Sequence, residues 1–160
     1  PEEPVSQFAT VDASYFDDAL FLGDSHTDGF HDYAGLGNAT YFTKNGLTVK
    51  DAMEKNFIEL DGKKVTLAEA LGTRQFGKVY ILLGINEIGA YTAADWAAQY
   101  KSLLDLVREK QPDAVIFIQS IFHTTQKKSD SSYFKNEVIN ERNAAKSQSD
   151  IDRWLTGLGY

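Results

Sequence analysis

The sequence contains no cysteine, so neither disulfide bonds nor thiolate metal ligands can contribute to its structure or chemistry. It is also poor in basic residues, because 16 Lys and Arg stand against 23 Asp and Glu, for a formal net charge of -7. Nucleic-acid binding draws most of its affinity from clustered basic side chains, so no nucleic-acid partner is expected. The short basic cluster of Lys127 and Lys128 is interpreted as a solvated loop.

Long apolar runs are absent too. No stretch approaches the roughly 20 residues that a transmembrane helix requires, and no signal peptide opens the chain. Residues 1–4 are acidic and contain two prolines, which is typical of a linker or of a start left after processing. This predicts a protein that is exported or on the cell surface of a bacterium, and a cytoplasmic location also fits the lack of cysteine. We expect residues 1–14 to be a linker or N-terminal extension and residues 15–160 to form a single domain.

Three short apolar runs predict strands that are buried on both faces of a parallel sheet. They are residues 19–22, 79–83 and 115–118. Between the second and third runs, apolar residues recur at helical spacing from Trp96 to Val107, and Pro112 marks the end of that helix. A strand, a helix and a strand in this order predict a right-handed crossover between parallel strands.

Other local signals predict the remaining elements. Asp61 and Gly62 predict a surface hairpin over residues 57–66, because Asp-Gly readily supplies the positive φ angles of a tight turn. Thr66 and Glu69 have the spacing of a capping box at the start of a short helix. Apolar spacings of three and four predict two further helices, at residues 131–146 and 150–158.

Candidate functional residues follow the predicted strands, because open α/β sheets bind ligands at the carboxyl ends of their strands. Ser25 lies on a strand-to-helix turn, where its hydroxyl can attack an acyl carbon, although Ser25 or Asp24 can equally cap the helix. Asn86 can donate its amide to an oxyanion or serve in a turn. Gly46 can offer a bare backbone N–H, or form an ordinary turn after Asn45.

These segments occur in an order that carries a specific resemblance. The chain resembles the SGNH hydrolases, also called GDSL-like lipases or acylhydrolases, in the segments Leu22-Gly23-Asp24-Ser25, Gly46 and Gly84-Ile85-Asn86-Glu87. The family has aspartate where this chain has Glu87. The strand at residues 115–119 and a helix carrying three asparagines are also similar to later family segments, so the resemblance covers residues 15–146. The asparagines are Asn136, Asn140 and Asn143.

The resemblance implies an α/β fold of three layers, α/β/α, with a mainly parallel flavodoxin-like sheet that is incomplete at its C-terminal end. It implies a serine esterase that needs no cofactor and cleaves small acyl esters, such as acetyl groups on carbohydrates or cell-envelope glycans, through an acyl-serine intermediate. In this interpretation Ser25 is the nucleophile, and the N–H groups of Ser25 and Gly46 and the Asn86 amide form the oxyanion hole. The residues expected to contact substrate are His26, Glu87 and His123.

The general base is not visible in its usual place. The family supplies it from an Asp-x-x-His segment, and the nearest match, Asp150-Ile151-Asp152-Arg153, has arginine instead of histidine. His123 follows the third strand at the correct edge of the sheet, and His26 is expected to line the pocket rim with its side chain away from the Ser25 hydroxyl. His31 is expected to be exposed. The base is therefore one of these histidines, a residue outside the sequence, or absent, and the histidines lack the paired spacing of metal ligands.

Two rival functions belong to other classes. If the base is absent, the chain is a catalytically silent module that binds an acylated or glycan ligand. A receiver-like signalling domain of similar topology would need clustered acidic residues and an opposing lysine at its strand ends, and Asp24 alone gives that hypothesis thin support.

Overall fold

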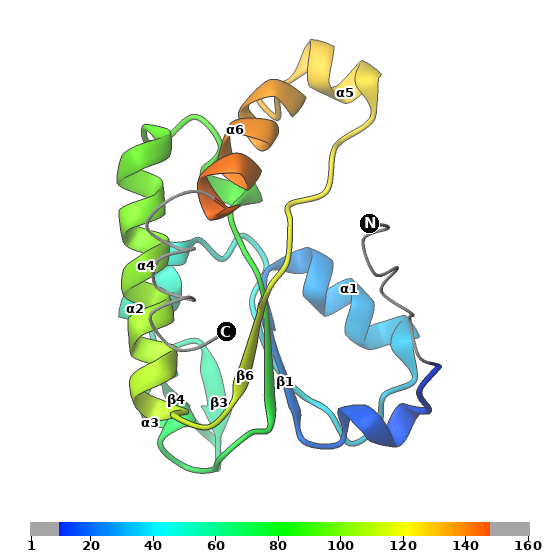
Figure 1. Cartoon of the computed structure of the whole chain (residues 1–160), viewed down its shortest axis with the longest axis vertical. Coiled ribbons are helices and arrows are strands. Elements are labelled where there is room, and N and C mark those ends of the chain that lie inside the picture. The colour runs from blue at the N-terminus through cyan, green and yellow to red at the C-terminus, as the bar shows by residue number, and fades with distance from the viewer. Residues whose placement is uncertain (1–9, 148–160) are drawn as a thin grey trace, which may run out of the picture.

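A computed structural model describes residues 10–147, so the N-terminal residues 1–4, the helix predicted at 150–158 and the Asp150–Arg153 segment lie outside the described residues. The centre of the structure is a parallel sheet with the strand order β2-β1-β5-β6 (Figure 1). This confirms the predicted mainly parallel sheet of flavodoxin-like order. The strands are β1 (Ala19–Gly23), β2 (Thr40–Thr43), β5 (Lys78–Leu82) and β6 (Val115–Ile118).

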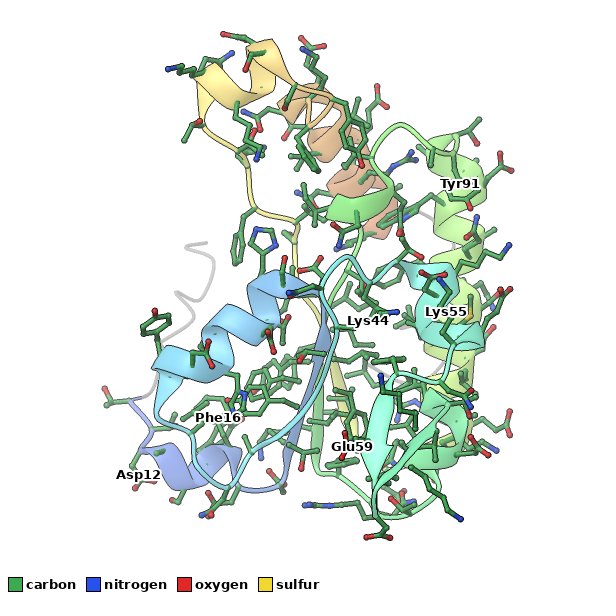
Figure 2. All side chains as sticks on the ribbon, turned by 180° about the vertical axis from the view of Figure 1, so that it is seen from behind. Asp12, Phe16, Lys44, Lys55, Glu59 and Tyr91 are labelled. Atoms are coloured by element: carbon green, nitrogen blue, oxygen red, sulfur yellow. The ribbon has the colours of Figure 1, made fainter. Side chains whose placement is uncertain are left out.

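Helices cover both faces of the sheet, which gives the predicted three layers (Figure 1). One face carries α2 (Val49–Glu54), α3 (Leu67–Leu71) and α4 (Ala93–Lys110), and the other carries α1 (Ser25–Ala34) and the 3-10 helix η1 (Ala13–Phe16). The ring of Phe16 lies 6.2 Å from that of Phe21 and 6.0 Å from that of Tyr80, between centroids (Figure 2). Phe16, near the start of the predicted domain, therefore packs against aromatic side chains of β1 and β5. No helix in residues 10–147 is long and apolar enough to cross a membrane.

The main core lies between the sheet and α4. Every residue of β1 is buried, as expected for a central strand of a parallel sheet. The residues of α4 whose spacing predicted the helix are all buried: Trp96, Tyr100, Leu103, Leu104 and Val107. The helix ends at Lys110, where Arg108 Nη1 donates to the carbonyls of Pro112 (2.9 Å) and Ala114 (2.8 Å).

The predicted hairpin and capping box are both present. Strands β3 (Ile58–Leu60) and β4 (Lys63–Val65) pair antiparallel, and the turn between them has φ values of 51° at Asp61 and 76° at Gly62. Thr66 and Glu69 form the reciprocal hydrogen bonds of the capping box at α3. Because Ile58 is buried, the hairpin contributes to the core as well as to the surface.

The segment after β6 corrects the prediction of one helix over residues 131–146. Two separate helices are present, and the second begins only at Asn136, whose side chain binds the Thr124 backbone by accepting from N (2.9 Å) and donating to O (3.1 Å). Lys127 and Lys128 are exposed as predicted, but they lie on a helix rather than in a loop. The two helices are α5 (Gln126–Ser131) and α6 (Asn136–Ser147).

Two glycines allow the helices to approach the ends of the central strands closely. A Cβ at Gly23 would lie 2.0 Å from Thr27 Oγ1 and 2.8 Å from the Leu82 carbonyl oxygen. Gly84 has a φ of 126°, and a Cβ there would lie 2.6 Å from the Trp96 ring. The carboxyl edge of the sheet therefore has no room for a side chain at either position.

Glu87 lies in the interior, in the 3-10 helix η2 (Ile85–Glu87) that follows β5, and is 3% exposed. Its Oε2 accepts from the Val49 backbone N–H (3.1 Å) and its Oε1 accepts from Trp96 Nε1 (2.6 Å). Burial raises the pKa of Glu87, and the hydrogen bonds from Trp96 and Val49 and the charge of Arg142 oppose that rise. The carboxyl group therefore joins the end of β5 to both α2 and α4.

Lys146 joins α6 to the end of β6. It is buried, its Nζ donates to the Gln119 carbonyl (2.6 Å), and the same atom lies 5.1 Å from the centroid of the Tyr100 ring. Burial lowers the pKa of Lys146 to about 7, while the charges of Glu87 and Asp24 oppose that change.

Gly23→Ala is predicted to destabilise the fold by about 1–3 kcal/mol, because its Cβ meets Thr27 and the Leu82 backbone. Gly29→Ala is the matched control, since no atom lies within 4 Å of a Cβ at this position in α1. Alanine favours helix over glycine, so we expect this variant to gain up to about 1 kcal/mol. Urea unfolding of both variants measures the difference, and equal effects would contradict the packing argument.

Glu87→Ala is predicted to cost about 3 kcal/mol or more, because it leaves the N–H groups of Val49 and Trp96 buried without their acceptor. Glu59→Ala is the control, because Glu59 is exposed on β3 (Figure 2) and its removal should change stability by no more than about 0.5 kcal/mol. Thermal and urea unfolding compare the pair. A small loss of stability in Glu87→Ala would show that the hydrogen bonds of Glu87 contribute little to the stability of the fold.

Lys146→Met is predicted to alter how stability depends on pH. Because the pKa of Lys146 is about 7 in the folded protein and roughly 10.4 in the unfolded chain, the unfolded state binds more protons between these values. The wild-type free energy of unfolding should therefore rise, relative to that of the variant, from about pH 7 to about pH 10. Below the folded pKa the difference should be flat. Urea unfolding of both proteins across this pH range measures the difference in their free energies of unfolding. A difference that does not change with pH would refute the lowered pKa of Lys146.

Candidate active site

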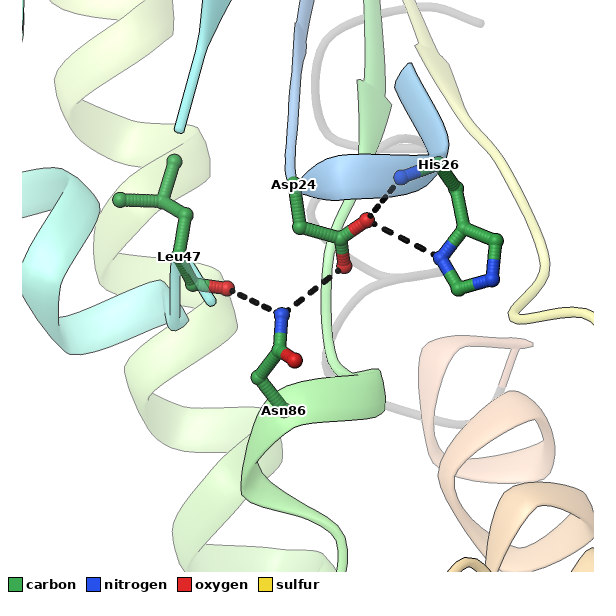
Figure 3. A network of polar contacts seen from close by, with 4 residues as sticks. All are labelled: Asp24, His26, Leu47 and Asn86. Atoms are coloured by element: carbon green, nitrogen blue, oxygen red, sulfur yellow. Dashed lines mark hydrogen bonds and ion pairs between the residues drawn. The ribbon is translucent and has the colours of Figure 1, made fainter. Parts of the chain in front are cut away.

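The buried carboxylate of Asp24 connects the segments that follow three strands of the sheet (Figure 3). Asp24 follows β1 and is 1% exposed, and its Oδ1 accepts from the His26 backbone N–H (2.9 Å) and lies 3.1 Å from His26 Nδ1. Its Oδ2 accepts from Asn86 Nδ2 (3.3 Å), after β5, and the same nitrogen donates to the carbonyl of Leu47 (3.1 Å), after β2. The polar groups at this edge are therefore held in one network.

Asp24, and not the Ser25 hydroxyl, caps the N-terminus of α1. Asp24 is the N-cap of α1, and its side chain accepts from the His26 N–H. Ser25 is the first residue of the helix and is exposed, and within residues 10–147 its hydroxyl has no hydrogen-bond partner. The capping alternative thus applies to Asp24, and the Ser25 hydroxyl remains open to a ligand.

The three groups predicted for the oxyanion hole differ in their hydrogen bonding. The Ser25 N–H lies in the first turn of α1, where backbone N–H groups have no acceptor within the helix. Gly46 has a φ of 73° in the turn after β2, and no acceptor for its N–H is found in the described part of the chain. The Asn86 amide nitrogen already donates to Asp24 and Leu47, so it can reach an oxyanion only by exchanging one of these contacts.

An open cleft of about 500 Å³ lies beside Ser25. This volume falls within the range of ligand-binding clefts. Four of the six residues predicted for the site line it: Ser25, His26, Asn86 and His123. Gly46 lies in the turn beside Asn86, and Glu87 is in the interior. The placement of Glu87 favours a structural role over the substrate contact that the sequence suggested.

The three histidines occupy distinct positions. The His26 ring lines the cleft, and its Nδ1 lies next to Asp24. When Nδ1 carries the proton and donates it to Asp24, Nε2 is the hydrogen-bond acceptor. The Nε2 of His123 lies 2.6 Å from Asn140 Oδ1, which leaves Nδ1 as the acceptor. His31 is exposed, as predicted, and stacks on Tyr41 at 4.1 Å between centroids. No three His, Asp or Glu side chains in the described ranges form a group suited to a metal ion.

A row of three asparagines on α6 fixes the segment that carries His123. Asn136 binds the Thr124 backbone, and Asn140 binds the His123 ring. Asn143 accepts from the Ile121 N–H (2.8 Å) and donates to its carbonyl (2.9 Å). No role was predicted for these residues, although the spacing of three amides on one helix face indicates such a row.

No protein-family model and no curated protein matches the chain. Several solved structures do match. An acylhydrolase from Bacteroides fragilis has a TM-score of 0.57 and 14% identity, and the match covers 87% of this chain and 64% of that one. A GDSL-like lipase from Parabacteroides merdae has a TM-score of 0.56 and 15% identity, covering 88% and 73%. A carbohydrate esterase of family 3 from Talaromyces cellulolyticus has a TM-score of 0.56 and 17% identity, covering 87% and 72%.

This chain thus spans between 64% and 73% of the length of these structures. The shared architecture agrees with the strand order β2-β1-β5-β6 and with the helices on both faces of the sheet. The chain therefore has the SGNH hydrolase fold of the GDSL-like lipases and acylhydrolases.

Proposed function

We propose that this protein hydrolyses small acyl esters, with Ser25 as the nucleophile and an acyl-serine intermediate. The observation that carries the proposal is the exposed Ser25 hydroxyl at the start of α1, in a cleft at the carboxyl edge of the sheet. Asp24 takes the capping role that would otherwise explain a serine at this place. The similarity of the fold to acylhydrolases and esterases supports the same reaction class.

The proposed mechanism uses groups that lie around the cleft. Ser25 Oγ attacks the ester carbonyl carbon while an imidazole takes its proton, and the carbonyl π electrons move onto oxygen. The N–H groups of Ser25 and Gly46 stabilise this oxyanion, and Asn86 joins them when its amide leaves Leu47 or Asp24. Collapse of the intermediate expels the alcohol, which takes the proton from the imidazolium. Water then attacks the acyl-serine by the same route and releases the carboxylic acid.

His26 and His123 are the two histidines that line the cleft with Ser25. His26 has a carboxylate partner, because its Nδ1 lies 3.1 Å from Asp24 Oδ1, and this contact orients the ring and leaves Nε2 free to accept a proton. His123 contacts a neutral amide, that of Asn140, instead of a carboxylate. The arrangement therefore favours His26 as the base, although it directly follows Ser25 in the helix.

The alcohol part of the ester is proposed to be a carbohydrate. The cleft presents several polar groups beside Ser25, including the side chains of His123, Thr124 and Thr125. Such groups suit the hydroxyls of a sugar. The carbohydrate esterase among the similar structures supports the same choice.

A binding module is the second candidate function. The observation that favours it is the arginine at position 153, where the family's Asp-x-x-His segment has histidine. Such a module would use the same cleft to hold an acylated or glycan ligand without cleaving it. It differs from the esterase in the reactivity of Ser25, which a covalent probe measures directly.

Ser25→Ala is predicted to lower hydrolysis of p-nitrophenyl acetate by about a thousandfold or more, because it removes the nucleophile. Ser102→Ala, at an exposed position of α4, is the control and should keep wild-type turnover. A fluorophosphonate should label the wild-type protein at Ser25 and leave the Ser25→Ala variant unlabelled, as intact mass and peptide mass spectrometry would show. Unchanged turnover in Ser25→Ala would remove Ser25 from the mechanism.

Efficient turnover with no fluorophosphonate labelling would also contradict an acyl-serine. If neither turnover nor labelling occurs while a glycan ester binds, the binding module replaces the enzyme. The variants His26→Ala and His123→Ala distinguish the two candidate bases, because loss of the base should slow both turnover and labelling. Wild-type activity in each of the two single variants would exclude both histidines as the required base.

A further inference from the structure

A second, smaller hollow of about 190 Å³ adjoins the cleft, on the face of the sheet that carries α1. We call it the phenyl pocket. Its apolar lining includes Phe21 of β1, Leu82 of β5, Phe30 of α1 and Phe122. The polar side chains in its lining include His26 and Gln119.

The floor of the phenyl pocket is a fixed part of the fold. Phe21 and Leu82 are buried side chains of neighbouring strands. The ring of Phe21 is stacked between those of Tyr41 (5.2 Å) and Tyr80 (4.8 Å), between centroids. A floor built from paired strands and stacked rings is shaped before any ligand arrives, which lowers the entropic cost of binding.

The walls of the phenyl pocket are aromatic rings that remain open to solvent. Phe30 is 44% exposed and Phe122 is 60% exposed. Phe122 lies between two residues that α6 holds, because Asn143 binds the Ile121 backbone and Asn140 binds the His123 ring. Exposed aromatic side chains that line a hollow are characteristic of sites for apolar ligand groups.

The phenyl pocket adjoins the cleft that contains Ser25 and shares two lining residues with it. His26 and Phe122 line both hollows, and their ring centroids lie 6.3 Å apart. A molecule whose reacting carbon lies at Ser25 can therefore extend past these two rings into the phenyl pocket. The polar cleft and the apolar pocket then accept the two different halves of one ester.

We propose that the phenyl pocket binds the acyl half of the substrate and that this acyl group carries an aromatic ring. A closed cavity of about 150 Å³ lined by aliphatic and aromatic side chains accepts benzene, so about 190 Å³ accommodates a phenyl ring with one or two further carbons. An acetyl group would leave most of this apolar surface in contact with water. The inference rests on the proposed function, since it names the acyl group of that reaction.

A binding experiment tests the phenyl pocket without requiring turnover. The Ser25→Ala protein is titrated with phenylacetate and, separately, with acetate, while backbone amide signals are followed by NMR. Phenylacetate should shift the signals of Phe30, Leu82 and Phe122 and bind at least about tenfold more tightly than acetate, because it buries a ring. Adding Phe122→Ala should weaken phenylacetate binding by about tenfold. Adding Tyr33→Ala, the control, should not, because Tyr33 is 91% exposed on α1 and outside the pocket lining.

Hydrolysis supplies the second readout. After division by their rates with hydroxide, p-nitrophenyl phenylacetate should exceed p-nitrophenyl acetate in kcat/KM by about tenfold, and Phe122→Ala should remove most of this preference. Hydrolysis with no preference, together with equal binding of the two carboxylates, would overturn the phenyl pocket and leave the proposed function standing. Binding of phenylacetate in the pocket, with no hydrolysis and no fluorophosphonate labelling, would overturn the proposed function and confirm the aromatic specificity of the pocket.

Discussion

The rest of the site depends on one buried carboxylate, that of Asp24. A buried charge is costly unless it is paired or hydrogen-bonded, and here the donors come from α1 and from the turn after β5. The Asn86 amide extends the network to Leu47, after β2. The requirement to satisfy one carboxylate therefore fixes three strand ends relative to one another, and with them the position of Ser25 at the start of α1.

Two further polar contacts hold the same edge from the opposite face. Glu87 connects η2 to α2 and α4, and Lys146 connects α6 to the end of β6. The asparagine row of α6 then holds the segment that includes Phe122 and His123. These contacts therefore connect segments that border the cleft to α2, α4 and α6. Such support keeps a site in the geometry that catalysis or binding requires.

The arrangement assigns different tasks to adjacent residues. Asp24 caps the helix and orients His26, while Ser25 carries the exposed hydroxyl. Beyond them, the polar cleft and the apolar phenyl pocket meet at the rings of His26 and Phe122. A reacting group placed at the boundary between a polar and an apolar hollow can distinguish the two halves of an ester by their chemistry.

Local sequence signals were sufficient to predict several of the helices and strands. The apolar runs predicted β1, β5 and β6, the spacing from Trp96 to Val107 predicted α4, and Asp61-Gly62 and Thr66-Glu69 predicted the hairpin and the capping box. Other features became visible only in the folded chain: the break between α5 and α6, the interior position of Glu87, the contacts of the asparagine row and the phenyl pocket. Each of these depends on partners that are distant in the chain, such as Thr124 for Asn136 or Val49 for Glu87. Periodicity and caps report the preferences of neighbouring residues, whereas these features follow from which polar groups the folded chain buries together.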